Sequence, residues 1–172
     1  MRKLKVGFAA AIMLTVAATG QARAQYNSAD RTAGASVKVV TAITIAKDTD
    51  LNFGEVVAGS TPGTVIMPPA GPPRTPTGGT TLGSGSGASS AQFTVSGDPN
   101  ATYAITLPGP TTLSDGGSNT LTVNTFTSTP SGTGALSGGG TEILKVGATL
   151  QVPATQPSGT YTGSFMVTVT YN

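Results

Sequence analysis

Apolar residues recur at every second position in several stretches of this chain, and this spacing predicts β-strands. The clearest runs cover residues 37–46, 92–107, 144–152 and 161–171. Successive side chains of a strand point to opposite faces of a sheet, so each run provides one apolar face. No stretch after residue 24 has the period of an amphipathic helix. Glycine and proline are abundant, and they suit turns between strands better than helices.

The alternating runs and the turns between them predict seven to nine short strands. That number is typical of an immunoglobulin-like β-sandwich, with a jelly roll or barrel as the alternative. We expect one all-β domain over residues 36–172, with no helix beyond an amino-terminal leader. Residues 51–57 and 64–67 predict further strands. Residues 68–90 hold hardly any large apolar side chain, which predicts a long exposed loop of proline, glycine and serine.

Two details of local structure are predicted for the middle of the chain. Residues 92–107 alternate on both sides of the turn-forming residues 97–100, which predicts a β-hairpin. The alternation that starts at Leu121 is broken at Phe126, and this break predicts a β-bulge near Thr125.

The first 24 residues have the pattern of a bacterial Sec-type signal peptide. Basic residues within 2–5 precede an uncharged apolar stretch at residues 6–18, which is too short to span a bilayer comfortably. Ala22 and Ala24 supply the small residues that a signal peptidase reads, so we expect cleavage before Gln25. The mature chain is expected in the periplasm, on the cell surface or outside the cell, without stable insertion in a membrane.

Removal of the leader reverses the sign of the net charge. Four of the nine basic residues lie in the leader, which leaves five basic residues against seven acidic ones. The mature chain has no cluster of lysine or arginine, so we expect it to bind neither nucleic acid nor anionic lipid.

Cysteine, histidine and tryptophan are absent from the sequence. The chain therefore offers no disulfide, thiol nucleophile, thiolate metal site or imidazole general base, and we expect no enzymatic activity and no cofactor. Asp48 and Asp50 are the only close pair of carboxylates. Two carboxylates in a turn are too few for Ca²⁺, which takes six or more oxygen ligands, so we interpret them as part of a hydrated loop.

Two other features are considered as sites and interpreted as structural. The Gly-Ser repeat at residues 83–87 superficially resembles a phosphate loop or a nucleophile elbow, but it lacks the strand-to-helix context that both require. We interpret it as a flexible linker. The tyrosines lie at strand positions, where core or sheet-rim roles are favoured over stacking on sugars; they are Tyr26, Tyr103, Tyr161 and Tyr171.

The first alternating run is long and is preceded by a polar segment, residues 25–35, that we expect to be flexible. Residues 36–46 therefore form a possible donor strand. Such a strand pairs either within its own sheet or with the open edge of a neighbouring molecule, and the residues leave both possibilities open.

Several motifs together resemble a secreted bacterial family, domain of unknown function 4402. The motifs are DLNFGEV at residues 50–56, AQFTVSG at 91–97, YAITL at 103–107, VGATL at 146–150, QPSGTYTGSF at 156–165 and VTVTY at 167–171. The same layout is similar to spore-coat-U-like and archaic chaperone–usher pilin domains.

The resemblance implies a pilus-type or surface structural subunit whose sandwich is completed by a neighbour's first strand. The partners it implies are further copies or related subunits, with a periplasmic chaperone and an outer-membrane usher. It implies that the donated side chains are Val37, Val39, Ile43 and Ile45. It also implies that the residues bordering the acceptor groove are Phe165, Val167, Val169 and Tyr171.

Overall fold

The computed structural model describes residues 29–85 and 87–172. The predicted signal peptide, its cleavage site and Tyr26 lie outside these residues. The chain divides into two units, Met1–Val37 and Lys38–Asn172. In the first unit, residues 29–37 have no regular secondary structure and are exposed. Within the described part of the chain, no helix has the length and hydropathy needed to cross a membrane.

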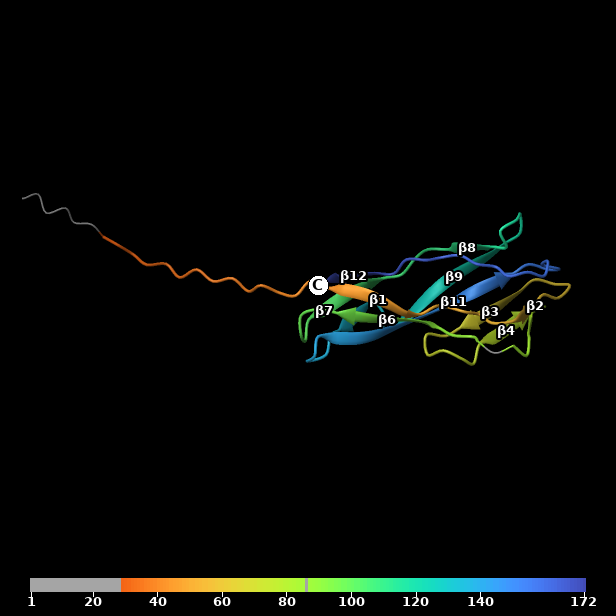
Figure 1. Cartoon of the computed structure of the whole chain (residues 1–172), viewed down its shortest axis with the longest axis horizontal. Coiled ribbons are helices and arrows are strands. Elements are labelled where there is room, and N and C mark those ends of the chain that lie inside the picture. The colour runs from red at the N-terminus through yellow and green to blue at the C-terminus, as the bar shows by residue number, and fades with distance from the viewer. Residues whose placement is uncertain (1–28, 86) are drawn as a thin grey trace, which may run out of the picture. The chain divides into compact units, whose positions relative to one another are not determined.

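The second unit consists of strands and their connections (Figure 1). The described residues form twelve strands and no helix, which confirms the all-β prediction of a sandwich or barrel-like fold, although the strands outnumber the seven to nine expected. The strands are β1 (Thr44–Thr49), β2 (Val56–Val57), β3 (Gly63–Met67), β4 (Thr75–Gly78), β5 (Thr81–Leu82), β6 (Ala91–Ser96), β7 (Thr102–Thr106), β8 (Thr111–Ser114), β9 (Thr120–Thr129), β10 (Thr133–Ala135), β11 (Thr141–Val152) and β12 (Thr168–Tyr171).

Strand β11 is the central strand of the largest sheet, in which the strand order is β1, β6, β11, β3 and β4. Strand β9 also pairs with β11, and β8 pairs with β9. Residues 141–146 of β11 pair with β6, and its residues 148–152 pair with β3 along the same edge. The other edge pairs with β9. One strand thus joins two halves of the unit, and the run predicted over residues 144–152 is confirmed.

Two smaller sheets complete the unit. Strands β10, β7 and β12 form one, and β2 and β5 form the other. In Figure 1, β7 and β12 lie at one end of the unit and β2 and β4 at the other.

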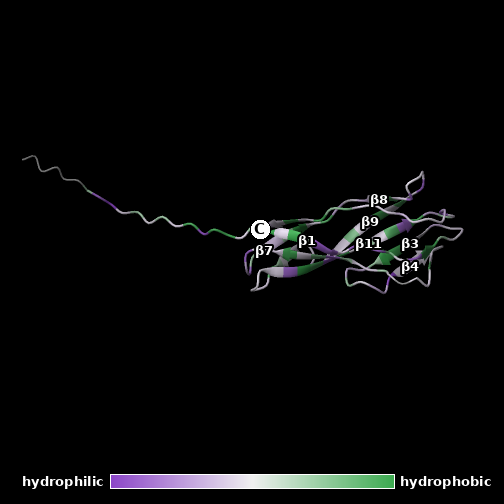
Figure 2. Ribbon diagram, in the orientation of Figure 1, coloured by the Kyte–Doolittle hydropathy of each residue, from purple (hydrophilic) through white to green (hydrophobic). Residues whose placement is uncertain are grey.

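Two hydrophobic clusters fill the space between the strands. Figure 2 shows both apolar and polar residues along β11, and its buried apolar residues are Leu144, Val146, Ala148, Leu150 and Val152. The β3-side cluster consists of Phe53, Val65, Met67, Leu121, Val123, Ala148, Leu150 and Val152. The β7-side cluster consists of Ala91, Val95, Tyr103, Leu136, Leu144, Val146 and Val167. Leu51 and Phe126 pack against both clusters.

Tyr103 is the largest fully buried side chain, and its hydroxyl has a charged partner. It donates a hydrogen bond of 2.8 Å to Oε2 of Glu142, which also accepts one from the backbone N–H of Ala135. Burial, and then the hydrogen bond to Glu142, raise the pKa of the Tyr103 phenol well above its usual range. The phenol therefore stays protonated and links β7 to β10 and β11.

The predicted bulge is confirmed in β9. Thr125 has a positive φ of 48°, and the register of β9 against β11 shifts between Gly147 and Thr149. The extra residue changes which positions face inward, so Leu121 and Val123 are buried before it and Phe126 packs inward after it.

The hairpin predicted over residues 92–107 is wrong. Strand β6 pairs with β1 and β11, whereas β7 pairs with β10 and β12. Residues 97–100 therefore carry the chain from one sheet to the other. Both strands bury residues in the β7-side cluster. The alternation of apolar residues in the sequence therefore predicted their buried faces correctly but not which strands they pair with.

The loop predicted over residues 68–90 contains two short strands, β4 and β5. Strand β4 lies at the edge of the large sheet and, among the residues that the structure describes, pairs with β3 alone. An edge strand tolerates Pro76 and needs no buried apolar side chain of its own, which explains why the hydrophobic pattern missed it.

Three predicted strands are shorter in the structure. The first begins at Thr44 rather than residue 37 and continues to Thr49 through the predicted turn. The second is reduced to β2, and the last to β12. The segments left without regular pairing form the site described below.

Candidate functional site

A groove of about 830 Å³ runs between two chain segments, residues 51–58 and 156–165. Its floor is apolar and belongs mostly to the β3-side cluster. The floor residues are Phe53, Leu121, Val123, Phe126, Leu150 and Val152. Among the lining residues, the charged ones are Asp50 and Glu55, both acidic.

The first wall, residues 51–58, is bonded to the rest of the unit along its outer edge. Asn52 exchanges two backbone hydrogen bonds of 2.9 Å with Ser89, and β2 pairs with β5. Glu55 adds a side-chain bond, because its Oε2 accepts the backbone N–H of Gly85 at 2.9 Å.

The second wall, residues 156–165, is also bonded on its outer side. Thr162 exchanges two backbone hydrogen bonds of 2.8 Å with Ser114, which ends β8. The Tyr161 hydroxyl donates to the carbonyl of Pro157, and the Gln156 amide donates to that hydroxyl.

The inner edges of the two walls face each other across the groove. Within the walls as the structure describes them, no backbone hydrogen bond joins one to the other. At one end of the walls the N–H of Thr155 donates to the carbonyl of Gly59 at 2.8 Å. The two walls belong to different sheets, because β2 pairs with β5 whereas Thr162 is bonded to Ser114 of the large sheet, and the groove lies between them.

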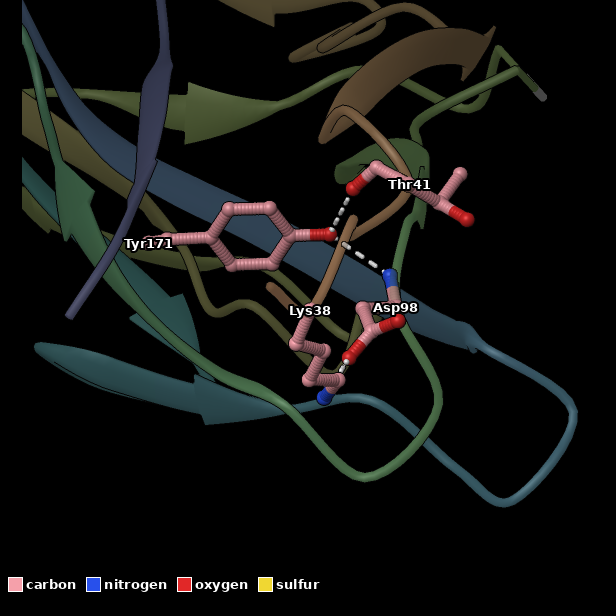
Figure 3. A network of polar contacts seen from close by, with 4 residues as sticks. All are labelled: Lys38, Thr41, Asp98 and Tyr171. Carbon is pink, nitrogen blue, oxygen red and sulfur yellow. Dashed lines mark hydrogen bonds and ion pairs between the residues drawn. The ribbon is translucent and has the colours of Figure 1, made fainter. Parts of the chain in front are cut away.

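Residues 38–41, which precede β1, are held beside β12 by a set of polar contacts that we call the clasp (Figure 3). In Figure 1, β12 lies at the end of the unit opposite to β2. The Tyr171 hydroxyl donates to the carbonyl of Thr41 at 2.7 Å and accepts the N–H of Asp98 at 2.6 Å. Lys38 forms an ion pair of 2.8 Å with Asp98, and this hydrogen bond raises the pKa of Lys38. The clasp fixes where the amino-terminal segment leaves the body.

Replacing Tyr171 by phenylalanine is expected to lower the free energy of unfolding by roughly 1–2 kcal/mol, because each lost hydrogen bond contributes about 0.5–1.5 kcal/mol. Denaturant titration measures the change. The control is Lys38→Met, which removes an ion pair whose lysine side chain is 75% exposed and is expected to change stability much less. Equal effects of the two variants would contradict the role given to the hydroxyl.

The structure places the four predicted donor residues in two groups. Val37 and Val39 are 86% and 87% exposed. Ile43 and Ile45 pack against the β7-side cluster, and Ile45 pairs with Val95 in the sheet. The two valines are therefore exposed, whereas Ile45 lies in β1, which pairs with β6, and Ile43 packs inward just before that strand.

The four residues predicted to border the acceptor groove are also separated. Phe165 lines the groove, where its ring centroid lies 5.0 Å from that of Phe126. Val167 is buried in the β7-side cluster, and Val169 and Tyr171 pack against it. The sequence predicted a strand at 51–57, and the motifs at 50–56 and 156–165 carried the family resemblance. It did not indicate that these segments line a groove, because free edges leave no signal in an apolar pattern.

The remaining candidates have local partners. Asp50 pairs with Lys47 at 2.6 Å, and Asp48 accepts a hydrogen bond from the Thr94 hydroxyl, so the two carboxylates do not converge. Asp115 caps the turn between β8 and β9, and hydrogen bonds from Asn119 and the backbone of Gly117 lower its pKa.

Comparison with known proteins gives one match. The family model "Domain of unknown function (DUF4402)" matches residues 43–171, which include both walls and the floor of the groove. Neither the curated proteins nor the solved structures give a match to the chain.

Proposed function

This chain belongs to the DUF4402 family, and we propose that it is an exported, non-enzymatic structural or adhesive subunit that assembles pilin-like surface polymers by donor-strand complementation. In this mode an extended segment of one subunit fills a gap in the sheet of the next. The proposed partners are further copies or related subunits, with a periplasmic chaperone and an outer-membrane usher as assembly factors. The proposed location is the periplasm, the cell surface or the extracellular space.

The groove is the observation that carries this proposal. Its walls are each paired on the outer side only, and its floor is made of buried leucine, valine and phenylalanine side chains. An inserted strand would satisfy the free backbone groups of both walls and cover the floor.

Energetics favour an inserted strand in this chain. The sequence has no cysteine, so no disulfide holds the two halves together. Each large apolar side chain that becomes buried contributes about 1.5–3 kcal/mol. A few such side chains therefore match a large part of the stability of an ordinary domain, which is about 5–15 kcal/mol.

A second candidate is a self-complemented, monomeric binding module of the periplasm or cell surface. It is favoured by the pairing of β1 with β6 within one chain. The groove volume of about 830 Å³ also lies within the range of small-molecule sites, which is roughly 300–1,000 Å³.

Truncation separates the two candidates. The full chain is exported with its leader, and a variant lacking residues 25–41 keeps β1 intact. Strand donation predicts multimers of the full protein that survive SDS without boiling, and their loss in the truncated variant. Gel electrophoresis with and without heating gives the readout, and circular dichroism verifies that the variant is folded.

The monomeric candidate predicts a different result. The full protein would sediment as a monomer at every concentration, even when a chaperone and an usher are co-expressed. That outcome would exclude assembly by strand donation.

A further inference from the structure

We infer that residues 33–39 of one copy occupy the groove of a second copy, with Ala33, Ala35, Val37 and Val39 on its floor, while Ile43 and Ile45 stay in the donor's own body. This inference rests on the proposed function and assigns its donor and acceptor residues. It differs from the expectation drawn from the sequence, which placed all four branched residues in the donated strand.

The division between donated and retained residues follows from burial. Val37 and Val39 are almost fully exposed, so little of their apolar surface is already covered. Ile43 and Ile45 already pack against the β7-side cluster, and Ile45 lies in β1 opposite Val95. Donating the isoleucines would remove β1 from its sheet and expose the cluster beneath it.

The spacing of the free segment suits a groove with one apolar side. As an extended chain, residues 33–39 place Ala33, Ala35, Val37 and Val39 on one face. Gly34, Ser36 and Lys38 lie on the other face, toward solvent. The segment is about as long as the facing wall, residues 51–58.

Charge agrees with this orientation. The charged residues that line the groove are Asp50 and Glu55, and the charge within residues 33–39 is Lys38. A lysine on the solvent face of an inserted strand lies near acidic residues of the rim rather than near like charge.

The clasp identifies a second copy as the occupant. Thr41 is bonded to Tyr171, and Lys38 to Asp98, so the segment leaves the body beside β12. The groove extends to β2, at the other end of the unit (Figure 1). Lys38 is 75% exposed along its side chain, so its ion pair is weak and can be released while the Thr41 bond stays.

Strand β12 does not fit as the acceptor. Val167, which precedes this strand, is buried in the β7-side cluster, and Val169 and Tyr171 of β12 pack against that cluster. None of the three lines the groove. The groove, in contrast, has an apolar lining between two walls that no backbone hydrogen bond joins to each other in the described part of the chain.

Aspartate substitutions on the two faces of the segment test the donor residues in the full chain. Val37→Asp and Val39→Asp are expected to reduce SDS-resistant multimers at least about tenfold, because an unpaired carboxylate is strongly disfavoured on an apolar floor. The matched controls are Ser36→Asp, which adds the same charge to the opposite face of the segment, and Val40→Asp, which adds it just after the segment. They are expected to change multimers less than about twofold, since these side chains stay hydrated.

Disulfide trapping tests the acceptor, and the cysteine-free sequence makes any cross-link unambiguous. A chain carrying Val37→Cys is folded together with a chain carrying Val56→Cys or Thr160→Cys, one on each wall. Mass spectrometry is expected to find mixed dimers joined at these positions. The controls are Ile45→Cys on the donor side and Ile143→Cys, outside the groove, on the acceptor side, which are expected not to cross-link.

The outcomes distinguish this assignment from the proposed function. Absence of multimers in the unmodified protein overturns both. Multimers that tolerate Val39→Asp, or that cross-link through Ile45 or to Ile143, overturn the assignment and leave strand donation standing.

Discussion

Replacing Leu144 by alanine is expected to lower the free energy of unfolding by about 2–5 kcal/mol. Leu144 is fully buried in β11 and belongs to the β7-side cluster. The substitution removes apolar surface and leaves a cavity that the surrounding strands can fill only in part. Urea titration of the purified protein measures the change as a shift of the unfolding midpoint.

Leu82→Ala is the matched control for this prediction. It is the same chemical change in β5, but Leu82 is 36% exposed and leaves no closed cavity. We expect the free energy of unfolding to fall by less than about 1 kcal/mol, because the partly exposed Leu82 side chain buries less apolar surface on folding than Leu144 does. Similar losses at the two sites would show that β11 is not the centre of the core.

Replacing Gly147 by alanine is expected to destabilise the protein by roughly 1–3 kcal/mol or more, through crowding rather than through a cavity. A Cβ atom at this position would press on the carbonyl oxygen of Met67 and on the backbone of Pro68 and Pro69. Since these are backbone atoms, the neighbouring chain has to move. Thermal and urea unfolding of the variant test the effect.

Gly109→Ala provides the comparison. A Cβ atom there would meet nothing within 4 Å, and its φ lies outside the left-handed region. We expect a neutral effect or a gain of up to about 1 kcal/mol from the restricted unfolded chain. If both glycine variants unfolded at the same urea concentration, the crowding at Gly147 would be contradicted.

These two positions in β11 mark what the sequence can and cannot reveal. Leu144 belongs to an alternating run that predicts a strand with one buried face, and the structure has that strand. Gly147 sits in the same run as a small residue without a visible role. Its importance comes from Pro68 and Pro69, which lie far away in sequence and cover it only in the folded chain.

The same distinction applies to strand pairing. Alternation on both sides of residues 97–100 identified two strands with buried faces, but they pair in different sheets. Apolar patterns report which face is covered, whereas hydrogen-bonding partners depend on the path of the whole chain.

The candidate site was only partly predictable for this reason. The sequence marked the amino-terminal run and Phe165, and the structure places Phe165 at the groove. It could not show that β1 starts only at Thr44. It also could not show that Ile43 and Ile45 pack against the β7-side cluster while Val37 and Val39 are exposed. It also could not show which wall edges remain unpaired, because that depends on the outer partners Ser89 and Ser114.

The hydrogen bond from the Thr155 N–H to the Gly59 carbonyl joins the two walls at one end of the groove, which has a consequence for the proposed filament. At this bonded end of the groove an inserted segment could go no further, so every copy would be inserted to the same depth. Each subunit would then advance the fibre by the same increment, and its length would depend on copy number alone.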